Sequence, residues 1–191
     1  MVGLAMSIRI SGGYLKGRLI NSPKNGDGIR PTTARVKLAI FSTLGQDRVR
    51  SKKVLDLYSC SGALGFESIS RGAVSVDFVE KNNKNCDLIM RNMELLEVRG
   101  LGKVHRTKCE MFLNRSDGEY DVVFLDPPYA IDNWDFVMSK VGEPGFMNSD
   151  GVVIAEHFRS VNLSESYGFI KCVDSRSYGD SNISYYEVSV G

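Results

Sequence analysis

The sequence predicts an α/β fold: a mostly parallel sheet with helices on both faces and an antiparallel hairpin at its C-terminal end. Two patterns predict it. From Val54 onward, short runs rich in β-branched and aromatic residues alternate with runs of helical period, as in βαβ units. Near the C-terminus, the β-rich runs 169–174 and 183–190 are joined by a polar segment without helical periodicity. The 191 residues, of which 42% are apolar, suffice for one sizeable core.

The alternating region gives a definite order of elements. The expected strands are Val54–Leu57, Val76–Val79, Val104–Thr107, Val122–Leu125 and Val152–Glu156. The expected helices are Ala63–Ser70, Lys84–Leu96, a short helix near Met111, and Trp134–Val141. With the terminal hairpin, this order predicts seven strands in one sheet.

The N-terminal segment has a different pattern. Ser7–Ile10 and Leu15–Ile20 flank a Gly-Gly pair and predict a short hairpin, and the turn-rich stretch 21–28 predicts a loop. A helix is expected to begin after Arg30-Pro31-Thr32-Thr33, where either threonine can cap it, and to end at Gly45. Arg35 and Lys37 lie off its apolar stripe, so we expect both to face solvent or a ligand.

Charge is distributed unevenly along the chain. Up to Lys53 there are 11 Lys or Arg and only two acidic residues, a net charge of +9, whereas the remainder carries 13 basic and 21 acidic residues, a net charge of −8. Clustered basic residues attract polyanions. We therefore expect residues 1–50 to form a basic extension that contacts nucleic acid, and residues 51–191 to form a catalytic domain.

Several classes of protein are disfavoured by the composition. The longest apolar runs are far shorter than the roughly 20 residues of a membrane span, and no export signal is recognisable, so we expect a cytoplasmic protein. Four cysteines stand at least 23 residues apart, and the two histidines, His105 and His157, lack a second ligand at helical spacing. We expect reduced thiols, hydrogen-bonded strand histidines and no metal site.

The first predicted βα turn has the residues of a nucleotide site. Strand 54–57 runs into a small-residue turn with Ser61 and Gly62, and ligands of open α/β sheets bind at the carboxyl ends of the strands. Glu80 ends the next strand, 18 residues after Gly62, near the spacing of an acid that accepts hydrogen bonds from ribose hydroxyls. Asp56 would repel a pyrophosphate but suits a cofactor with an ammonium group. This combination favours S-adenosylmethionine over a dinucleotide.

The fourth strand runs directly into Asp126-Pro127-Pro128-Tyr129. Adjacent prolines fix the backbone, so a rigid rim is expected at the ligand-binding edge. The Asp126 carboxylate and the Pro127 carbonyl can both accept hydrogens from an exocyclic amine of a base, which directs the lone pair of the amine nitrogen at a methyl sulfonium. Tyr129 offers a face on which an extruded base can stack.

Together, these segments resemble the bacterial RsmD family of Rossmann-like class I methyltransferases. The resemblance is carried by Ile8-Arg9-Ile10, Gly12-Gly13, Gly17-Arg18, Gly28 to Thr33 with Arg35-Val36, Ser61 to Gly65, Glu80 and Asp126 to Tyr129. It implies transfer of a methyl group from S-adenosyl-L-methionine to the N2 amine of a guanine in 16S ribosomal RNA, guanine 966, on naked RNA or on an assembling small subunit. We expect a monomer.

The resemblance also assigns residues to the site. Cofactor contacts are implied for the turn after the first strand, for the ribose acid and for the adenine region: Asp56, Tyr58, Ser61, Gly62, Glu80, Lys81, Cys109, Glu110 and Asp126. The catalytic residues implied are Asp126, Pro127 and Tyr129. Contacts with RNA are implied for Arg9, Lys16, Arg18, Arg30, Thr32, Thr33 and Arg35.

Three positions depart from the family pattern. Cys60 replaces a glycine and fits the turn if its φ is negative, although it crowds the cofactor. Ala34 replaces an acid, and Lys108 stands where Asp or Asn is usual, with Glu110 as a possible substitute.

Other functions compete with this interpretation. A DNA adenine-N6 or cytosine-N4 methyltransferase would use the same Asp-Pro-Pro-Tyr motif, but the chain is short for an additional target-recognition domain. An RNA-binding module with a vestigial cofactor site is disfavoured by the intact acids Asp56, Glu80 and Asp126. A nicotinamide dehydrogenase has no use for the motif.

Overall fold

The computed structural model describes residues 6–23, 34–116, 118–127 and 132–189. An eight-stranded sheet has the order β5-β4-β3-β6-β7-β10-β9-β8. The strands from β5 to β7 are parallel, and β10, β9 and β8 continue the sheet in antiparallel pairings. The predicted α/β class is confirmed, with the C-terminal hairpin at one sheet edge.

The elements have the following bounds. The strands of the sheet are β3 (Lys53–Leu57), β4 (Ser75–Glu80), β5 (Gly102–Arg106), β6 (Tyr120–Leu125), β7 (Met147–Phe158), β8 (Ser166–Tyr167), β9 (Ile170–Tyr178) and β10 (Ser181–Val188). The helices are α1 (Ala34–Leu44), α2 (Ala63–Ser70), α3 (Asn83–Leu96), the 3₁₀ helix η1 (Arg99–Leu101), α4 (Cys109–Leu113) and α5 (Trp134–Val141). A separate hairpin is formed by β1 (Met6–Arg9) and β2 (Leu19–Ser22).

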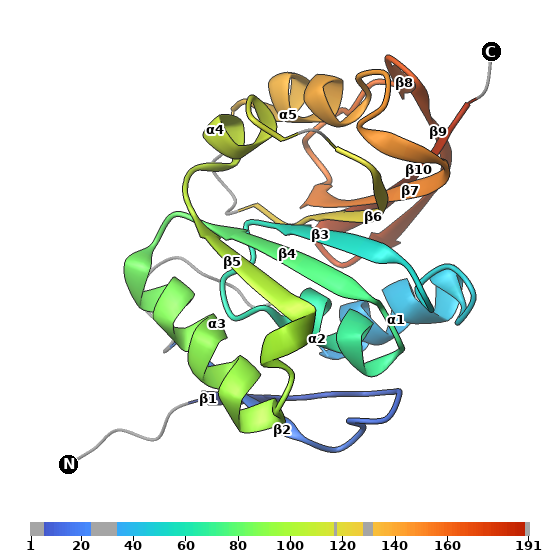
Figure 1. Cartoon of the computed structure of the whole chain (residues 1–191). Helices are drawn as coiled ribbons and strands as arrows, with labels where there is room; N and C mark the ends of the chain where they lie inside the picture. The colour runs from blue at the N-terminus through green and yellow to red at the C-terminus, as the bar shows by residue number, and fades with distance from the viewer. Residues whose placement is uncertain (1–5, 24–33, 117, 128–131, 190–191) are drawn as a thin grey trace.

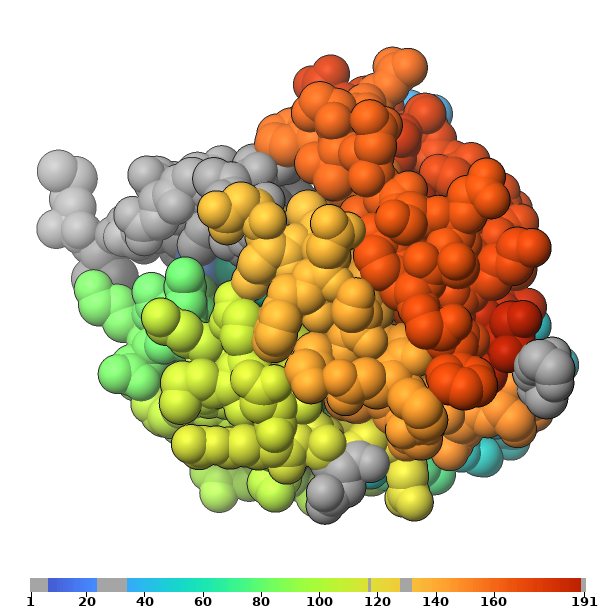
Figure 2. Space-filling model, turned by 90° about the horizontal axis from the view of Figure 1, so that it is seen from above, coloured from blue at the N-terminus to red at the C-terminus, as the bar shows by residue number. Residues whose placement is uncertain are grey.

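Alternate side chains of each parallel strand enter two different hydrophobic clusters. Phe78 and Phe124 belong to the cluster shared with α1, α2, α3 and the β1-β2 hairpin. Leu57 and Leu125 belong to the cluster shared with α4 and α5. Figure 1 shows the resulting layers, with α4 and α5 above the sheet, α1 to α3 below it, and the hairpin outermost. Figure 2 looks onto the upper face, where the yellow-green α4 region lies beside the orange α5 region.

The N-terminal hairpin differs from the prediction in its second strand. β2 begins at Leu19, and the register pairs Met6 with Ser22 and Arg9 with Leu19. The Gly-Gly pair is no tight hairpin turn: Gly13 has φ +76°, and a Cβ there would lie 1.8 Å from the Ser70 carbonyl oxygen. The segment between the strands instead docks on the end of α2, where Leu15 N donates to Ser70 Oγ at 2.9 Å. The sheet also has one strand more than the seven predicted, because β8 pairs with β9.

Lys37 contradicts the expectation that it faces solvent or a ligand. Its side chain is 1% exposed and pairs with Glu67, itself fully buried, at 2.8 Å. Lys37 Nζ also donates to the Arg9 carbonyl at 2.7 Å. Glu67 further accepts hydrogen bonds from Ser11 N, Ser11 Oγ and Gly12 N, at 3.0, 2.7 and 2.8 Å. These residues, which we call the Glu67 clamp, join α1, α2 and the N-terminal segment, so the Lys37 side chain is enclosed.

Candidate functional site

Three carboxylates gather at the carboxyl ends of adjacent parallel strands. Leu57 of β3 is level with Val79 of β4 and Leu125 of β6, so Glu80 and Asp126 follow at the same level. Because side chains alternate along a strand, Asp56 lies on the same face of the sheet as these two acids. The structure therefore brings together the three acids singled out in the sequence.

The electrostatics of this edge favour a positively charged ligand. The pKa of the Asp56 carboxyl is raised well above its usual value by burial, and the negative charges of Asp126 and Glu80 add to the shift. Burial also raises the pKa of the Cys60 thiol to about 12, with further contributions from Glu80, Asp126 and Asp56. Among the residues that the structure describes, no group of three metal-ligating side chains is found. A positive charge is what these acids favour in a ligand.

The turn between β3 and α2 is held by two of the acids. Glu80 Oε2 accepts from Cys60 N at 3.0 Å and Glu80 Oε1 from Asn82 N at 2.7 Å, while Asp56 Oδ2 accepts from Gly65 N at 3.0 Å. The condition under which Cys60 is expected to fit the turn, a negative φ, is not met: its φ is +51°, in the left-handed region. For an L-residue this conformation costs about 1 to 2 kcal/mol. The hydrogen bond from Cys60 N to Glu80 helps to stabilise it.

The remaining residues assigned to the cofactor differ in exposure. Ser61, Gly62 and Cys109 are buried, Tyr58 and Glu110 are half-buried, and Lys81 is exposed. Asn133 at the start of α5 donates to Glu110 Oε1. Burial and the neighbouring Glu110 raise the pKa of Cys109 to about 12, so the thiol is protonated at neutral pH. Cys109 and Glu110 form the first turn of α4, and Glu110 is joined to the start of α5 through Asn133.

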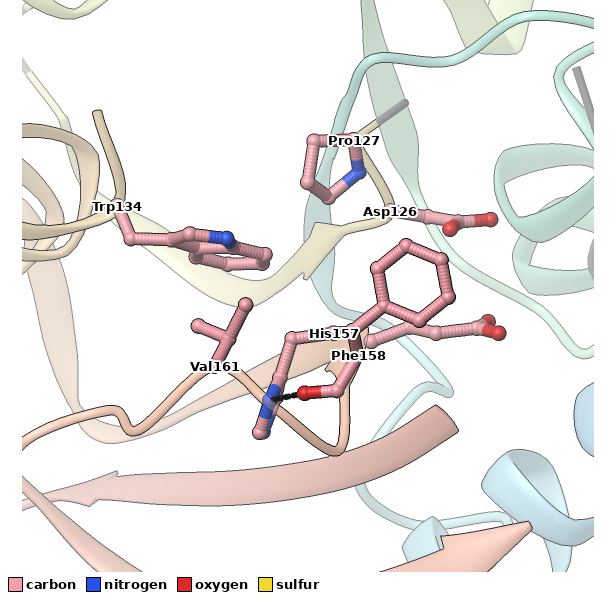
Figure 3. A pocket seen from close by; sticks show the side chains of 7 residues that line it. Asp126, Pro127, Trp134, His157, Phe158 and Val161 are labelled. Carbon is pink, nitrogen blue, oxygen red and sulfur yellow. Dashed lines mark hydrogen bonds between the residues drawn. The ribbon is translucent and has the colours of Figure 1, made fainter. Parts of the chain in front are cut away.

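Beside Asp126, a small hollow opens to solvent. It is lined by Asp126, Pro127, Trp134, Glu156, His157, Phe158 and Val161. Figure 3 shows that the Pro127, Trp134 and Phe158 rings surround this space, with Asp126 at its rim. Sequence reasoning missed Trp134, Glu156 and Phe158. The signal for Glu156 was its position at the end of a predicted parallel strand, where ligands of α/β sheets bind.

The histidines are hydrogen-bonded, as the sequence predicts. His157 contacts Ser184 Oγ through Nε2 and the Phe158 carbonyl through Nδ1, both at 2.9 Å. Burial lowers the His157 pKa below its usual value, although hydrogen bonds to the Phe158 and Val161 carbonyls oppose the shift. His105 Nε2 contacts Asp77 Oδ1 at 2.6 Å. The four cysteines are free thiols, and no described helix is long and apolar enough to cross a membrane.

The basic residues of the N-terminal region lie on the surface. Arg9, Lys16, Arg18 and Arg35 are exposed. Arg9 donates to the Gly17 carbonyl at 2.9 Å within the N-terminal segment, and Arg18 donates to the Leu95 carbonyl at the end of α3 at 2.6 Å. Arg30, Thr32, Thr33 and Tyr129 lie outside the described residues.

Several solved structures and curated proteins that resemble the chain are described as methyltransferases. An Escherichia coli structure described as "Putative methyltransferase yhhF" has a TM-score of 0.86 at 23% identity, and the match covers 97% of this chain and all of that one. This likeness confirms the Rossmann-like methyltransferase fold.

Two curated proteins are similar to this chain in sequence. The Bacillus subtilis (strain 168) protein named "Putative rRNA methyltransferase YlbH" is 31% identical over 183 residues, 94% of this chain and 98% of that protein. Ribosomal RNA small subunit methyltransferase D of Escherichia coli (strain K12) is 29% identical over 149 residues, 78% of this chain and 74% of that protein. The family described as "Conserved hypothetical protein 95" matches residues 8–187. The chain belongs to this family, which is the RsmD family that its sequence motifs resemble.

Proposed function

We propose that the chain transfers a methyl group from S-adenosylmethionine to the N2 amine of a guanine in small-subunit ribosomal RNA. One observation carries the proposal: the rim at Asp126 and Pro127 borders both the acidic end of β3 and β4 and a hollow with aromatic walls. The charge of the acidic end suits a positively charged methyl donor, and the rings around the hollow suit stacking against a flat base. The name of the Escherichia coli relative, which acts on small-subunit ribosomal RNA, supports the choice of substrate.

The residues around the β3–α2 turn fit the cofactor. Asp56 is buried and its carboxyl pKa is raised, so an ammonium group beside it would relieve the unfavourable burial of negative charge. Glu80 has two oxygens at the end of β4, in the position of an acid that binds a ribose diol. When bound, S-adenosylmethionine supplies an electrophilic methyl group on a sulfonium.

The chemical step depends on the orientation of the target amine. The lone pair of the guanine N2 nitrogen is delocalised into the ring, which makes the amine a poor nucleophile. Asp126 and the carbonyl of Pro127 accept the two amine hydrogens, so the nitrogen becomes pyramidal and its lone pair points at the methyl group. After transfer the nitrogen is positively charged, and its proton is acidic enough to leave to water.

Asp56 links folding to cofactor binding. We expect Asp56→Asn to raise the Tm of the ligand-free protein at pH 7 and to weaken S-adenosylmethionine binding by roughly 1.5 to 3 kcal/mol, the range for hydrogen bonds to charged groups. The fold raises the pKa of Asp56, so ionised Asp56 destabilises the folded state, and this penalty disappears below the unfolded pKa of about 3.9. The Tm gain should therefore vanish as the pH falls below roughly 4. Calorimetric titration measures the change in affinity and melting curves measure the change in Tm, with the surface variant Asp150→Asn as the control. A lower Tm of Asp56→Asn at pH 7 would contradict the stability prediction, and an unchanged affinity would contradict the binding prediction.

Glu80 is expected to contribute to cofactor affinity. Glu80→Ala should weaken S-adenosylmethionine binding by roughly 1 to 3 kcal/mol, because charged hydrogen bonds are removed. The variant also removes the acceptor for Cys60 N and Asn82 N. Glu94→Ala, on the exposed face of α3, is the control. Unchanged affinity in calorimetry would remove Glu80 from the site.

The basic extension formed by residues 1–50 is proposed to contact phosphates. Replacing Arg9, Arg18 and Arg35 with Ala should flatten the salt dependence of RNA binding by about 0.7 to 0.9 slope units for each phosphate that the variant no longer binds. Cofactor affinity should not change. An unaltered slope in a filter-binding titration would mean that these residues only face solvent.

The proposed reaction is tested with purified protein, S-adenosylmethionine and RNA of the small subunit. Nucleoside mass spectrometry should detect N2-methylguanosine in the RNA and no methylated base in duplex DNA. Methyladenine or methylcytosine in DNA would replace the proposal with a DNA methyltransferase. Binding of S-adenosylmethionine without any methylated product would contradict the assignment of the substrate.

A further inference from the structure

A second carboxylate, Glu156, lines the hollow beside the catalytic rim. Leu125 of β6 pairs with Ala155 of β7 in parallel register, so Asp126 and Glu156 are the next residues at the same level of neighbouring strands. Glu156 is half-buried, and it faces the hollow together with Pro127. Two acids from adjacent strands therefore border one hollow at the carboxyl edge of the sheet.

The other walls of the hollow are flat, apolar and held in place. Trp134 begins α5, and its indole ring meets the His157 ring edge-on, with 6.0 Å between centroids and an interplanar angle of 75°. His157 is fixed by hydrogen bonds to Ser184 and to the Phe158 carbonyl. The Pro127 and Phe158 rings lie across from Trp134 (Figure 3). Such walls stack on any base and do not distinguish one base from another, so discrimination must come from a polar group.

The edge of guanine beside its N2 amine carries a hydrogen-bond donor, N1–H. Adenine N1, beside the N6 amine, and cytosine N3, beside the N4 amine, are acceptors. A carboxylate next to the amine-binding acid accepts a hydrogen bond from guanine but repels the lone pair of adenine or cytosine. Polar groups that match one substrate and are left unpaired by another give strong discrimination.

We propose that Glu156 is a specificity-determining residue that accepts the N1–H of the target guanine, while Asp126 and the Pro127 carbonyl accept the hydrogens of its N2 amine. This assignment rests on the proposed function. It accounts for why an Asp-Pro-Pro-Tyr site, whose chemistry suits any exocyclic amine, would select guanine. Glu156 forms no bond in the reaction and takes no proton from the amine.

The decisive substrate pair is guanine and 2-aminopurine at the same position of one RNA. Both bases carry the N2 amine, but N1 of 2-aminopurine is an acceptor without hydrogen. The RNA is a small-subunit fragment around the guanine that the wild-type protein methylates, made with either base. Single-turnover rates at saturating S-adenosylmethionine give the guanine to 2-aminopurine ratio for each variant.

We expect the wild-type protein to prefer guanine by at least about 100-fold. Glu156→Gln, whose amide can donate to N1, should lower the ratio at least tenfold by slowing guanine and sparing or accelerating 2-aminopurine. Glu156→Ala should also lower the ratio, by slowing guanine alone. Glu187→Gln, a surface change on neighbouring β10, should leave the ratio at the wild-type value.

If both Glu156 variants keep the wild-type ratio of guanine to 2-aminopurine rates, even with equal loss of activity on both RNAs, the role of Glu156 is overturned. The proposed function is not affected by that result. The proposed function fails separately, when the wild-type protein forms no N2-methylguanosine in any small-subunit RNA.

Discussion

Asp126→Ala is expected to lower the rate of methyl transfer by several orders of magnitude while S-adenosylmethionine affinity and the fold stay nearly intact. The carboxylate acts mainly as the amine becomes pyramidal, so its loss raises the barrier more than it weakens binding of either substrate. Single-turnover rates at saturating RNA and cofactor isolate this step. Activity near the wild-type value would refute the assignment of the active site.

Asp126→Asn separates two roles for the same carboxylate. The amide oxygen still accepts one hydrogen bond, so this variant should keep more activity than Asp126→Ala if orientation of the amine dominates. If the carboxylate instead acted as a general base, both variants would lose activity equally, because neither alanine nor asparagine can take the proton. We expect the first result, because the amine proton becomes strongly acidic only after the methyl group has arrived. Equal rates of the two variants would contradict the hydrogen-bonding account.

Glu67→Ala is expected to lower the free energy of unfolding by about 3 to 5 kcal/mol, the cost of leaving one charge of a buried pair without its partner. The variant leaves the ammonium of Lys37, which is 1% exposed, with the Arg9 carbonyl but without its carboxylate. It also removes the acceptor for Ser11 and Gly12, so the N-terminal segment loses these hydrogen bonds to α2 and keeps those to Ser70. Urea unfolding followed by circular dichroism measures the loss.

The double variant Lys37→Met with Glu67→Leu is the matched control. It should be far less destabilising than Glu67→Ala, because the buried ammonium of Lys37 is removed together with its carboxylate, whereas Arg71, which also pairs with Glu67 at 3.0 Å, loses that partner equally in both variants. If the single variant is as mild as the double variant, the Glu67 clamp does not stabilise the fold in the way described.

The clamp also predicts a pH dependence. Burial alone would raise the pKa of Glu67, but hydrogen bonds from Lys37 and Ser11 hold it below its usual value. The stabilisation is therefore complete above the unfolded pKa of about 4.3 and is lost as the pH falls through the lower folded pKa. The stability difference between the wild type and Glu67→Gln should shrink over that range. A difference that persists at lower pH would contradict the direction of the shift.

The sheet and its helices could be predicted because their local patterns agree with their packing. The bounds of α2 and α5 match the predicted ranges Ala63–Ser70 and Trp134–Val141. Parallel strands buried on both faces read as short apolar runs, and their carboxyl ends meet at one edge of the sheet. The same rule allowed Asp56, Glu80 and Asp126 to be placed together before their geometry was known.

Other features depend on interactions between distant segments. Lys37 is off the apolar stripe of α1, and its burial is accounted for by Glu67, 30 positions further along the chain, together with the Arg9 carbonyl. The segment after β1 docks on Ser70 and delays the second strand to Leu19, which no hairpin pattern reveals. The hollow beside Pro127 combines α5 with the end of β7. A local sequence pattern predicts neither these contacts between distant segments nor the positive φ of Cys60.

The central claim, methylation of a guanine N2 amine in small-subunit ribosomal RNA, is tested most directly by nucleoside mass spectrometry of that RNA from cells with and without the protein. Loss of the gene should remove N2-methylguanosine from one position of the RNA. The wild-type gene should restore it, and the Asp126→Ala variant, expressed at the same level, should not. An unchanged content of N2-methylguanosine in cells that lack the protein would contradict the account.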